Sequence, residues 1–423
     1  MPRFRFGALG AILLVAQAAT PPAAVAQAAP RDATGLSPLT LEEAVTRAMQ
    51  HGPAAQASSA ARQVVVGRAR ADAQWANPTF ELRRENEGSP LPYDDFATFT
   101  LPVSFTGRRF ALRDALGAAR ERGAADSLFV QREAGFDAAR EWWTVWAASS
   151  MADFAAAQAT RFAELARFDS LRAAEGAIAE ASAIRTRLEA ERAGYHAVQA
   201  TAAAGRARAA LAARIGLEDP RTLRIAAPPQ LDLSPLTLTS DEAVAQALAS
   251  RPDVRAAQAA VREADRRRAA EDRGSFADVG VTAGYKGTSG YATGVVGLFV
   301  TPPVLNANGG NRERATGEWL LADAERRAIE IRARGEVQAA YDAVRAMDAL
   351  AVRADAASPA RADELASAAE AAYREGHATL TETLEALRAV ADLRAAALQA
   401  TADRHLIRLD LRRAMGAPVL ETP

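Results

Sequence analysis

The sequence contains the same unit twice, and this repetition constrains the fold more than any other feature. The stretch LTLEEAVTRAMQHGPAAQA begins at Leu39, and LTSDEAVAQALASRPDVRA begins at Leu238, about 199 residues later. Other landmarks recur at nearly the same spacing: Pro102 with Pro302, Glu175-Gly176 with Glu375-Gly376, and Ile215-Gly216 with Met415-Gly416. A period of this length indicates the duplication of a whole domain rather than a short solenoid repeat.

The first residues have the pattern of an export signal. Arg3 and Arg5 precede a short apolar run, and Ala26-Gln27-Ala28 forms a cleavage site of small residues. We therefore expect residues 1–28 to be a signal peptide that directs the chain across the inner membrane. A disordered alanine-rich tail is the alternative. No later stretch is apolar and long enough to predict a transmembrane helix.

The remaining chain divides at the repeated landmarks. The segment between the two copies is rich in proline and has little hydrophobic periodicity, which indicates a linker. The predicted parts are a first repeat at 29–216, a linker at 217–235, a second repeat at 236–416 and a C-terminal tail at 417–423.

Each repeat is predicted to begin with a capped helix. Thr40 and Glu43 have the spacing of a capping box, in which the threonine oxygen accepts an early backbone N–H and the glutamate accepts the N–H of the threonine. Thr239 and Glu242 have the same spacing in the second copy. Prolines at 53 and 252 then end the short helix and can start the next one.

A very long helical hairpin is predicted later in each repeat. Residues from Arg108 to about Arg172 contain almost no helix breaker, and sixty-odd helical residues span about 100 Å. The second copy repeats this pattern from about Asn311 to Tyr373. Gly176 and Gly376 mark the predicted turns of the two hairpins. Helices of this length need partners along their whole length, as in a coiled-coil array.

Two β-hairpins are predicted, at about 78–105 and about 278–301. Phe80 and Leu82 alternate with charged residues, and Val279 and Val281 alternate with glycine and threonine, whereas the alternation within ATGVVGLFV is ambiguous. Strands of about nine residues can cross a bilayer when tilted, although a half-buried hairpin of a soluble domain is the alternative. Four strands cannot close a barrel, so strands that span a membrane would require oligomerisation.

Composition excludes several classes of function. The net charge of −1 does not favour nucleic acid, and the absence of cysteine excludes disulfides and thiolate metal sites. We find no phosphate-binding loop, nucleophile elbow or zinc-protease helix, so neither an enzyme nor a bound cofactor is expected. The histidines are scattered and predict no metal site, with His377 beside the second turn as the weak exception. The tryptophans at 142, 143 and 146 are expected to pack between helices.

Several stretches together resemble the TolC-type outer-membrane efflux channels. They are LTLEEAV, NPTFELRREN, RPDVRAAQAAVREA and TPPVLNANGGNR, in this order, with the two Glu-Gly turns. The second and fourth stretches look most like the branch that serves heavy-metal export pumps. Many relatives carry a lipidated N-terminal cysteine, which this chain lacks, so no lipid anchor is expected.

The resemblance implies a fold and an assembly. The fold is mainly α with a small β part, in which duplicated long antiparallel helices form an α-barrel. Four strands per chain would contribute to a twelve-stranded transmembrane β-barrel of a homotrimer. The implied location is the outer membrane of a Gram-negative bacterium, surrounded by lipid, with a large periplasmic part. The implied partners are a periplasmic adaptor protein and an inner-membrane pump of the resistance-nodulation-division class.

The resemblance also implies where functional residues lie. The turns would form periplasmic tips that contact the adaptor, with Glu175 and Gly176 in one tip and residues 374–376 (Arg374, Glu375, Gly376) in the other. Glu382 and Glu385 would form a periplasmic gate, at positions where the family usually has aspartates, and Tyr373 would help to hold the closed state. A spacing of three places both glutamates on one face of a helix. A solvated helix face is the alternative, and Ser182 and Arg185 occupy the corresponding positions of the first copy.

The sequence therefore predicts a passive exit duct of a tripartite efflux system, with heavy-metal cations or small toxic compounds as cargo. A duct for type I protein secretion shares the same features. A soluble periplasmic coiled-coil adaptor is the alternative from a different class of protein.

Overall fold

The computed structural model describes residues 38–86, 93–103, 105–229, 236–275, 278–288, 291–353 and 358–420. The expected signal peptide at 1–28 lies outside the described residues, as do residues 230–235 of the expected linker and the last three residues of the expected tail. Within the described ranges, no helix has an apolar stretch long enough to cross a membrane.

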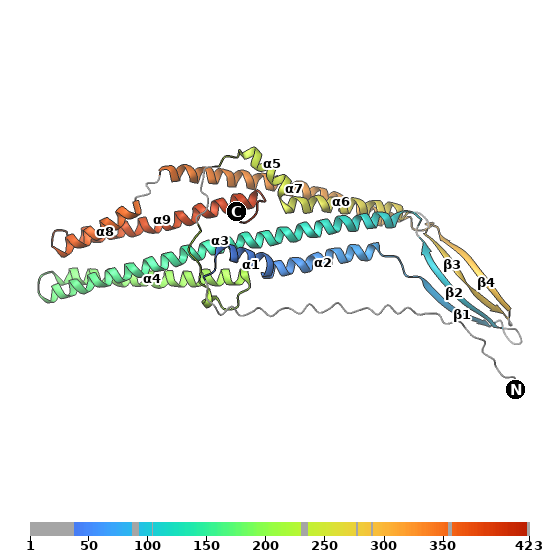
Figure 1. The fold of residues 1–423 in the computed structure, drawn as a ribbon, viewed down its shortest axis with the longest axis horizontal. Coiled ribbons are helices and arrows are strands. Elements are labelled where there is room, and N and C mark those ends of the chain that lie inside the picture. The colour runs from blue at the N-terminus through green and yellow to red at the C-terminus, as the bar shows by residue number, and fades with distance from the viewer. Residues whose placement is uncertain are drawn as a thin grey trace, which may run out of the picture. The chain divides into compact units, whose positions relative to one another are not determined.

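The fold is mainly helical with one small sheet, as the sequence predicts (Figure 1). The first half of the chain contains α1 (Leu41–His51), α2 (Pro53–Ala73), β1 (Thr79–Asn86), β2 (Tyr93–Val103), α3 (Arg108–Ala174) and α4 (Glu180–Ile215). After the short 3-10 helix Pro220–Thr222, the second half contains α5 (Ser240–Ser250), α6 (Pro252–Arg273), β3 (Asp278–Thr288), β4 (Tyr291–Thr301), α7 (Gly309–Arg353), α8 (Ser358–Arg374) and α9 (Leu380–Ala414).

Both capping boxes predicted at the repeat starts are present. The backbone N–H of Thr40 donates to Glu43 Oε2 at 2.9 Å, and the N–H of Glu43 donates to Thr40 Oγ1 at 3.1 Å. Thr239 and Glu242 make the same reciprocal pair at the start of α5. Each box satisfies backbone donors that have no partner inside the helix, so these sequence signatures determine where α1 and α5 begin.

The longest helix, α3, has neighbours on both sides along its length. Its C-terminal part forms the hairpin with α4, and other parts of its surface pack on α1, α2, α6 and α9 (Figure 1). The 67 residues of α3 extend for about 100 Å. Packing of this kind supplies the contacts that stabilise such a long helix, because tertiary burial contributes more than helix propensity.

The helix predicted from about Asn311 to Tyr373 is described in two parts, and residues 354–357 between them lie outside the described residues, so the continuity of this helix stays a prediction. The first part, α7, ends at Arg353, and α8 begins at Ser358.

The four strands form one antiparallel sheet in the order β1-β2-β3-β4. The two hairpins come from different repeats, and β2 pairs with β3 from Asp94↔Thr288 to Val103↔Val279. The sheet therefore joins the two repeats through backbone hydrogen bonds.

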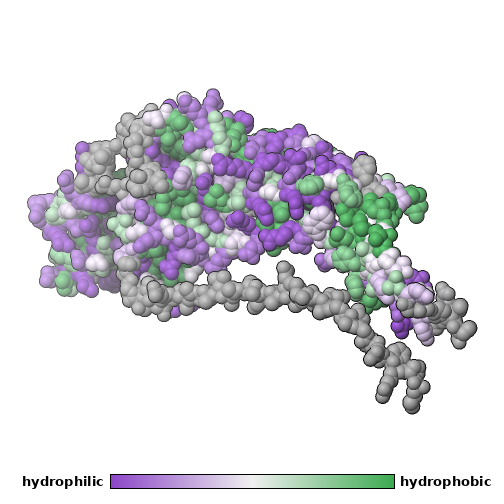
Figure 2. All heavy atoms as spheres, turned by 45° about the vertical axis from the view of Figure 1, so that its right-hand side comes forward, coloured by the Kyte–Doolittle hydropathy of each residue, from purple (hydrophilic) through white to green (hydrophobic). Residues whose placement is uncertain are grey.

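One face of the sheet is apolar and exposed in the single chain. Paired residues point to the same face, so the pairing Phe80↔Phe99↔Ala283↔Val296 defines one row of it. Its other large members are Leu82, Leu101, Val281, Tyr285, Leu298 and Val300, and Figure 2 shows hydrophobic side chains gathered over the strands. The ambiguous strand β4 thus places Val296 on the apolar face, where 86% of its surface is exposed.

Tryptophans form the core where the two repeats meet. Trp142 and Trp143 of α3 are fully buried, and Trp142 Nε1 donates to the carbonyl of Leu39 at 3.1 Å. Trp143 stacks on His405 of α9 with a 4.0 Å separation of ring centroids. This confirms the prediction that these tryptophans pack between helices.

Candidate functional site

The two helical turns have the same geometry. Gly176 and Gly376 have φ angles of 73° and 81°, in the left-handed region that glycine adopts at low cost. The N–H of Ala177 donates to the carbonyl of Arg172 at 2.8 Å, and the N–H of His377 donates to the carbonyl of Ala372 at 2.7 Å. Each glycine therefore ends one helix and lets the chain return as the next.

The turns lie at the ends of the helical hairpins remote from the sheet (Figure 1). All residues expected to contact an adaptor are exposed there: Glu175, Gly176, Arg374, Glu375 and Gly376. Just behind the turns, an apolar cluster joins the two hairpins, with Phe162 and Leu165 from α3 and Leu384 and Leu387 from α9. The tips of the two repeats are thus held together by a common core.

Tyr373 belongs to this core rather than to the surface. Only 5% of the residue is exposed, and its hydroxyl donates to Asp169 Oδ1 at 2.8 Å. Burial, together with the hydrogen bond to Asp169 and its charge, raises the pKa of Tyr373 to about 12. The bond links the end of α8 to α3, so it fastens the second hairpin to the first.

Asp169 is a functional candidate that sequence reasoning missed. It is fully buried, and its Oδ2 atom has no hydrogen-bond partner within the described part of the chain. A sequence signal was available, because Asp169 lies three or four residues after the apolar Leu165 and Ala166 and so falls on the buried face of α3. A carboxylate at such a position requires a polar partner, although the sequence does not name Tyr373 as that partner.

Further polar contacts cross between the two hairpins. Arg161 of α3 pairs with Glu370 of α8 at 3.0 Å, and Arg388 of α9 pairs with Glu189 of α4. Arg185 Nη1 donates to Thr381 Oγ1 at 3.4 Å. The first-copy counterpart of Glu385 is therefore a cation that reaches the start of α9.

Glu382 caps its own helix. Its Oε2 atom accepts hydrogen bonds from the backbone N–H and from the hydroxyl of Thr379, both at 2.8 Å. These bonds lower the pKa of Glu382 below its usual value. The sequence carried this signal, because Thr379 and Glu382 have the same spacing as the capping boxes at 40 and 239.

Glu385 differs from Glu382 although both lie on α9. It is exposed and has no hydrogen-bond or ion-pair partner among the described residues. Its neighbours Leu384 and Leu387 are buried in the core of the tip. Glu385 is consequently the carboxylate of the pair that is free to act on surroundings outside the single chain.

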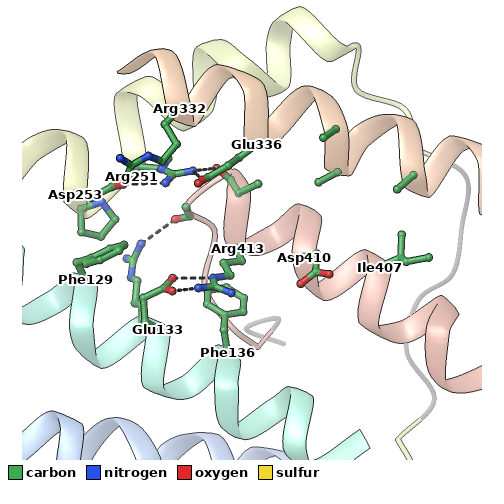
Figure 3. Close-up of a pocket in the computed structure, with 17 residues that line it drawn as sticks. Phe129, Glu133, Phe136, Arg251, Asp253, Arg332, Glu336, Ile407, Asp410 and Arg413 are labelled. Atoms are coloured by element: carbon green, nitrogen blue, oxygen red, sulfur yellow. Dashed lines mark hydrogen bonds and ion pairs between the residues drawn. The ribbon is translucent and has the colours of Figure 1, made fainter. Parts of the chain in front are cut away.

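Figure 3 shows a separate pocket of about 510 Å³ where α3, α6, α7 and α9 come together. Arg251 donates to Glu336 at 2.7 Å and to Asp253 at 2.8 Å, and Arg413 pairs with Glu133. These charges neutralise one another across the pocket wall. The arrangement fits a structural junction between the start of α6 and the end of α9.

Metal-binding geometry is not found in the described part of the chain. No group of three or more His, Asp or Glu side chains there could hold a metal ion. His377 lies 3.9 Å from Glu375 at the exposed tip.

Comparisons with known proteins agree with this architecture. The family model described as outer membrane efflux protein matches residues 243–417. By sequence, no curated protein matches the chain. Among solved structures, the outer-membrane channel CmeC of Campylobacter jejuni matches with a TM-score of 0.76 and 14% identity, over 89% of this chain and 85% of CmeC. VceC, an outer membrane protein of Vibrio cholerae, matches with a TM-score of 0.73 and 17% identity, over 90% and 97% of the two chains. The MtrE channel of Neisseria gonorrhoeae matches with a TM-score of 0.70 and 18% identity, over 90% and 89%.

Proposed function

We propose that this protein is the exit duct of a tripartite efflux system. Two observations support the proposal: the chain has the fold of the TolC-type outer-membrane channels, and residues 243–417 match the outer membrane efflux family. Members of this family are transport ducts and not enzymes. In this role the chain conducts passively, and the energy comes from an inner-membrane pump of the resistance-nodulation-division class. A periplasmic adaptor connects the pump to the duct.

The exposed apolar face of the sheet is the single observation that carries this proposal. Large apolar side chains that are more than half exposed, such as Leu82, Val296 and Leu298, favour lipid as their surroundings. Within the described part of the chain, the same four strands leave one edge of β1 and one edge of β4 without a partner strand. In lipid each unpaired backbone group costs several kcal/mol, so neighbouring subunits must supply the missing strands.

A homotrimer satisfies both requirements. Three copies of four strands give twelve, which is within the range of closed barrels that leave an open interior. Each β1 edge then pairs with the β4 edge of the next subunit. The long helices of three subunits would continue the barrel as a helical tunnel into the periplasm, which supports an outer-membrane location.

We assign the tips of the tunnel to adaptor binding and gating. The exposed residues Glu175 and Glu375 and their neighbouring glycines are available to an adaptor. Threefold symmetry would gather Glu382 and Glu385 of the subunits into a ring of carboxylates that attracts cations. The hydrogen bond from Tyr373 to Asp169 would hold the second hairpin in the closed position.

The cargo we propose is heavy-metal cations or small toxic compounds. A type I protein-secretion duct would have the same fold and gate, so it remains the second candidate within this family. A soluble adaptor fits less well, because an exposed apolar sheet would promote aggregation in water.

Reconstitution tests the proposal. The purified protein should require detergent, should migrate as a heat-sensitive oligomer, and should form conducting pores in planar lipid bilayers. A folded monomer that stays soluble without detergent would rule out the duct.

The gate assignment has its own test. Replacing Glu382 and Glu385 together by glutamine should weaken the block of single-channel current by divalent cations. Glu191→Gln, an exposed glutamate of α4, serves as the control. An unchanged block in the double variant would show that the ring does not form.

A further inference from the structure

Phe299 is an aromatic residue on the polar face of the sheet. Its neighbours in β4, Leu298 and Val300, pair with Val281 and Val279 on the apolar face, so Phe299 points the opposite way. That opposite face carries Thr100 and Thr282, whose hydroxyls are hydrogen-bonded at 2.9 Å. Residue Phe299 is 41% exposed in the single chain.

Gly280 provides the place where this ring lies. It is the direct cross-strand partner of Phe299, and a methyl group added to Gly280 would overlap the ring atoms Cε1 and Cζ. The ring therefore lies across the backbone of β3 instead of projecting from the sheet. On its other side Gly280 pairs with Pro102 of β2.

We propose that Phe299 lines the conduction path at the helix end of the sheet, and that Gly280 keeps this path wide by letting the ring lie against the wall. This assignment rests on the proposed duct function, in which the apolar face contacts lipid and the opposite face contacts the lumen. Phe299 lies two residues before the end of β4 at Thr301, or about 7 Å along the strand. Threefold symmetry then places three such rings at one level near the base of the barrel.

The glycine matters because any larger residue would occupy the position of the ring. A partly exposed phenylalanine can move to another side-chain rotamer at small cost. On this face the available space is the lumen, so the displaced rings would narrow the path and present apolar surface to the cargo.

Single-channel conductance in planar bilayers tests whether the Phe299 ring must pack against Gly280 for the path to stay wide. Gly280→Ala should lower the conductance relative to the unmodified channel. Gly297→Ala is the matched control, because Gly297 lies on the same face of β4 and, among the described residues, an added methyl group would meet only Thr282 Cβ, at 3.8 Å. Equal conductance of the two glycine variants would overturn the proposal.

A second substitution distinguishes a clash with the Phe299 ring from an effect of Gly280→Ala on the backbone. In the double variant with Gly280→Ala and Phe299→Ala, the conductance should return at least to that of the unmodified channel. If Gly280→Ala alone fails to assemble, the double variant should restore assembly. A double variant that remains as defective as Gly280→Ala would contradict a role for the ring.

The orientation of the side chain is tested by chemical labelling, which the absence of cysteine in the native chain makes simple. A water-soluble, membrane-impermeant thiol reagent should reduce the current of Phe299→Cys channels and should not affect Val300→Cys channels. The reverse result would place Phe299 toward lipid and refute the proposal. An unmodified protein that forms no channel would instead refute the duct function itself.

Discussion

At the scale of the residue, the hydrogen bond from Tyr373 to Asp169 joins α8 to α3 at the tip. A buried carboxylate that loses the one hydrogen-bond partner it has among the described residues retains the full cost of desolvation, about 1–3 kcal/mol for a hydrogen-bonding group. Tyr373→Phe removes the hydroxyl and preserves the packing of the ring. We therefore expect this change to weaken the attachment of α8 to α3 without disturbing the core.

The ionisation of Tyr373 provides a direct measurement of this contact. The pKa of Tyr373 is raised from 10.0 to about 12, because the neutral phenol donates to Asp169 in a buried site. The contribution to stability is therefore complete below pH 10 and is lost as the pH rises through about 12. An ultraviolet-absorbance titration should show one late-ionising tyrosine that is missing in Tyr373→Phe. Identical titration curves would contradict the buried hydrogen bond.

The cap of α9 gives a second prediction at this scale. Thr379→Ala removes the acceptor for the N–H of Glu382 and should cost about 0.5–2 kcal/mol. Hydrogen exchange of the first-turn amides of α9 should become faster. Thr401→Ala within the same helix is the control and should leave these amides unchanged, since the Thr401 hydroxyl donates to the carbonyl of Ala397 in its own helix. Equal effects of the two substitutions would exclude the capping box.

At the scale of the element, the glycine turns determine how each hairpin closes. An L-residue in the left-handed region costs about 1–2 kcal/mol, and both turn glycines occupy this region although no other atom crowds them. Glycine is therefore needed at these turns because of the backbone conformation, and not because a side chain would lack space.

Alanine substitution separates these two requirements. Gly176→Ala and Gly376→Ala should each destabilise their hairpin by about 1–2 kcal/mol, measured as faster limited proteolysis at the tip. Gly194→Ala in α4 is the control, because this helical glycine also has open space and should be stabilised by about 0.5–1 kcal/mol. A tip variant that resists proteolysis as well as the control would show that the left-handed turn is dispensable.

At the scale of the whole molecule, the proposed duct requires the two faces of the sheet to separate lipid from lumen. Adjacent valines of β4 point in opposite directions, since Val296 pairs with Ala283 on the apolar face and Val295 pairs with Gly284 on the other. The same substitution at these two positions therefore tests the whole assembly.

Val296→Arg should prevent stable insertion, because an arginine on the lipid face of a barrel costs about 2–4 kcal/mol at mid-membrane depth. Val295→Arg should assemble and alter only ion selectivity. The measurement is the yield of heat-sensitive oligomer in outer-membrane fractions. Equal yields of the two variants would contradict the assignment of the faces.

Much of the fold could be predicted from the sequence, because local signals determine it. Such signals come from residues close together in the sequence. They include the capping boxes at 40 and 239, the absence of helix breakers in α3 and the apolar alternation in β1 to β3. The candidate site was less predictable. The spacing of Thr379 and Glu382 indicates a cap, whereas the sequence analysis assigns Glu382 to a gate or to a solvated helix face and gives no role to Asp169.

By itself, the sequence determined the duplication, the places where helices begin and turn, and the apolar alternation of three strands. These properties depend on backbone conformation and on neighbours close in the chain. Only the tertiary structure decided which face Val296 and Phe299 occupy, that β2 pairs with β3 across the repeats, and that Tyr373 bonds to Asp169. Each of these depends on contacts between segments far apart in the chain. Hydrophobic periodicity indicates that a side chain is buried, but it does not identify the residue that this side chain contacts.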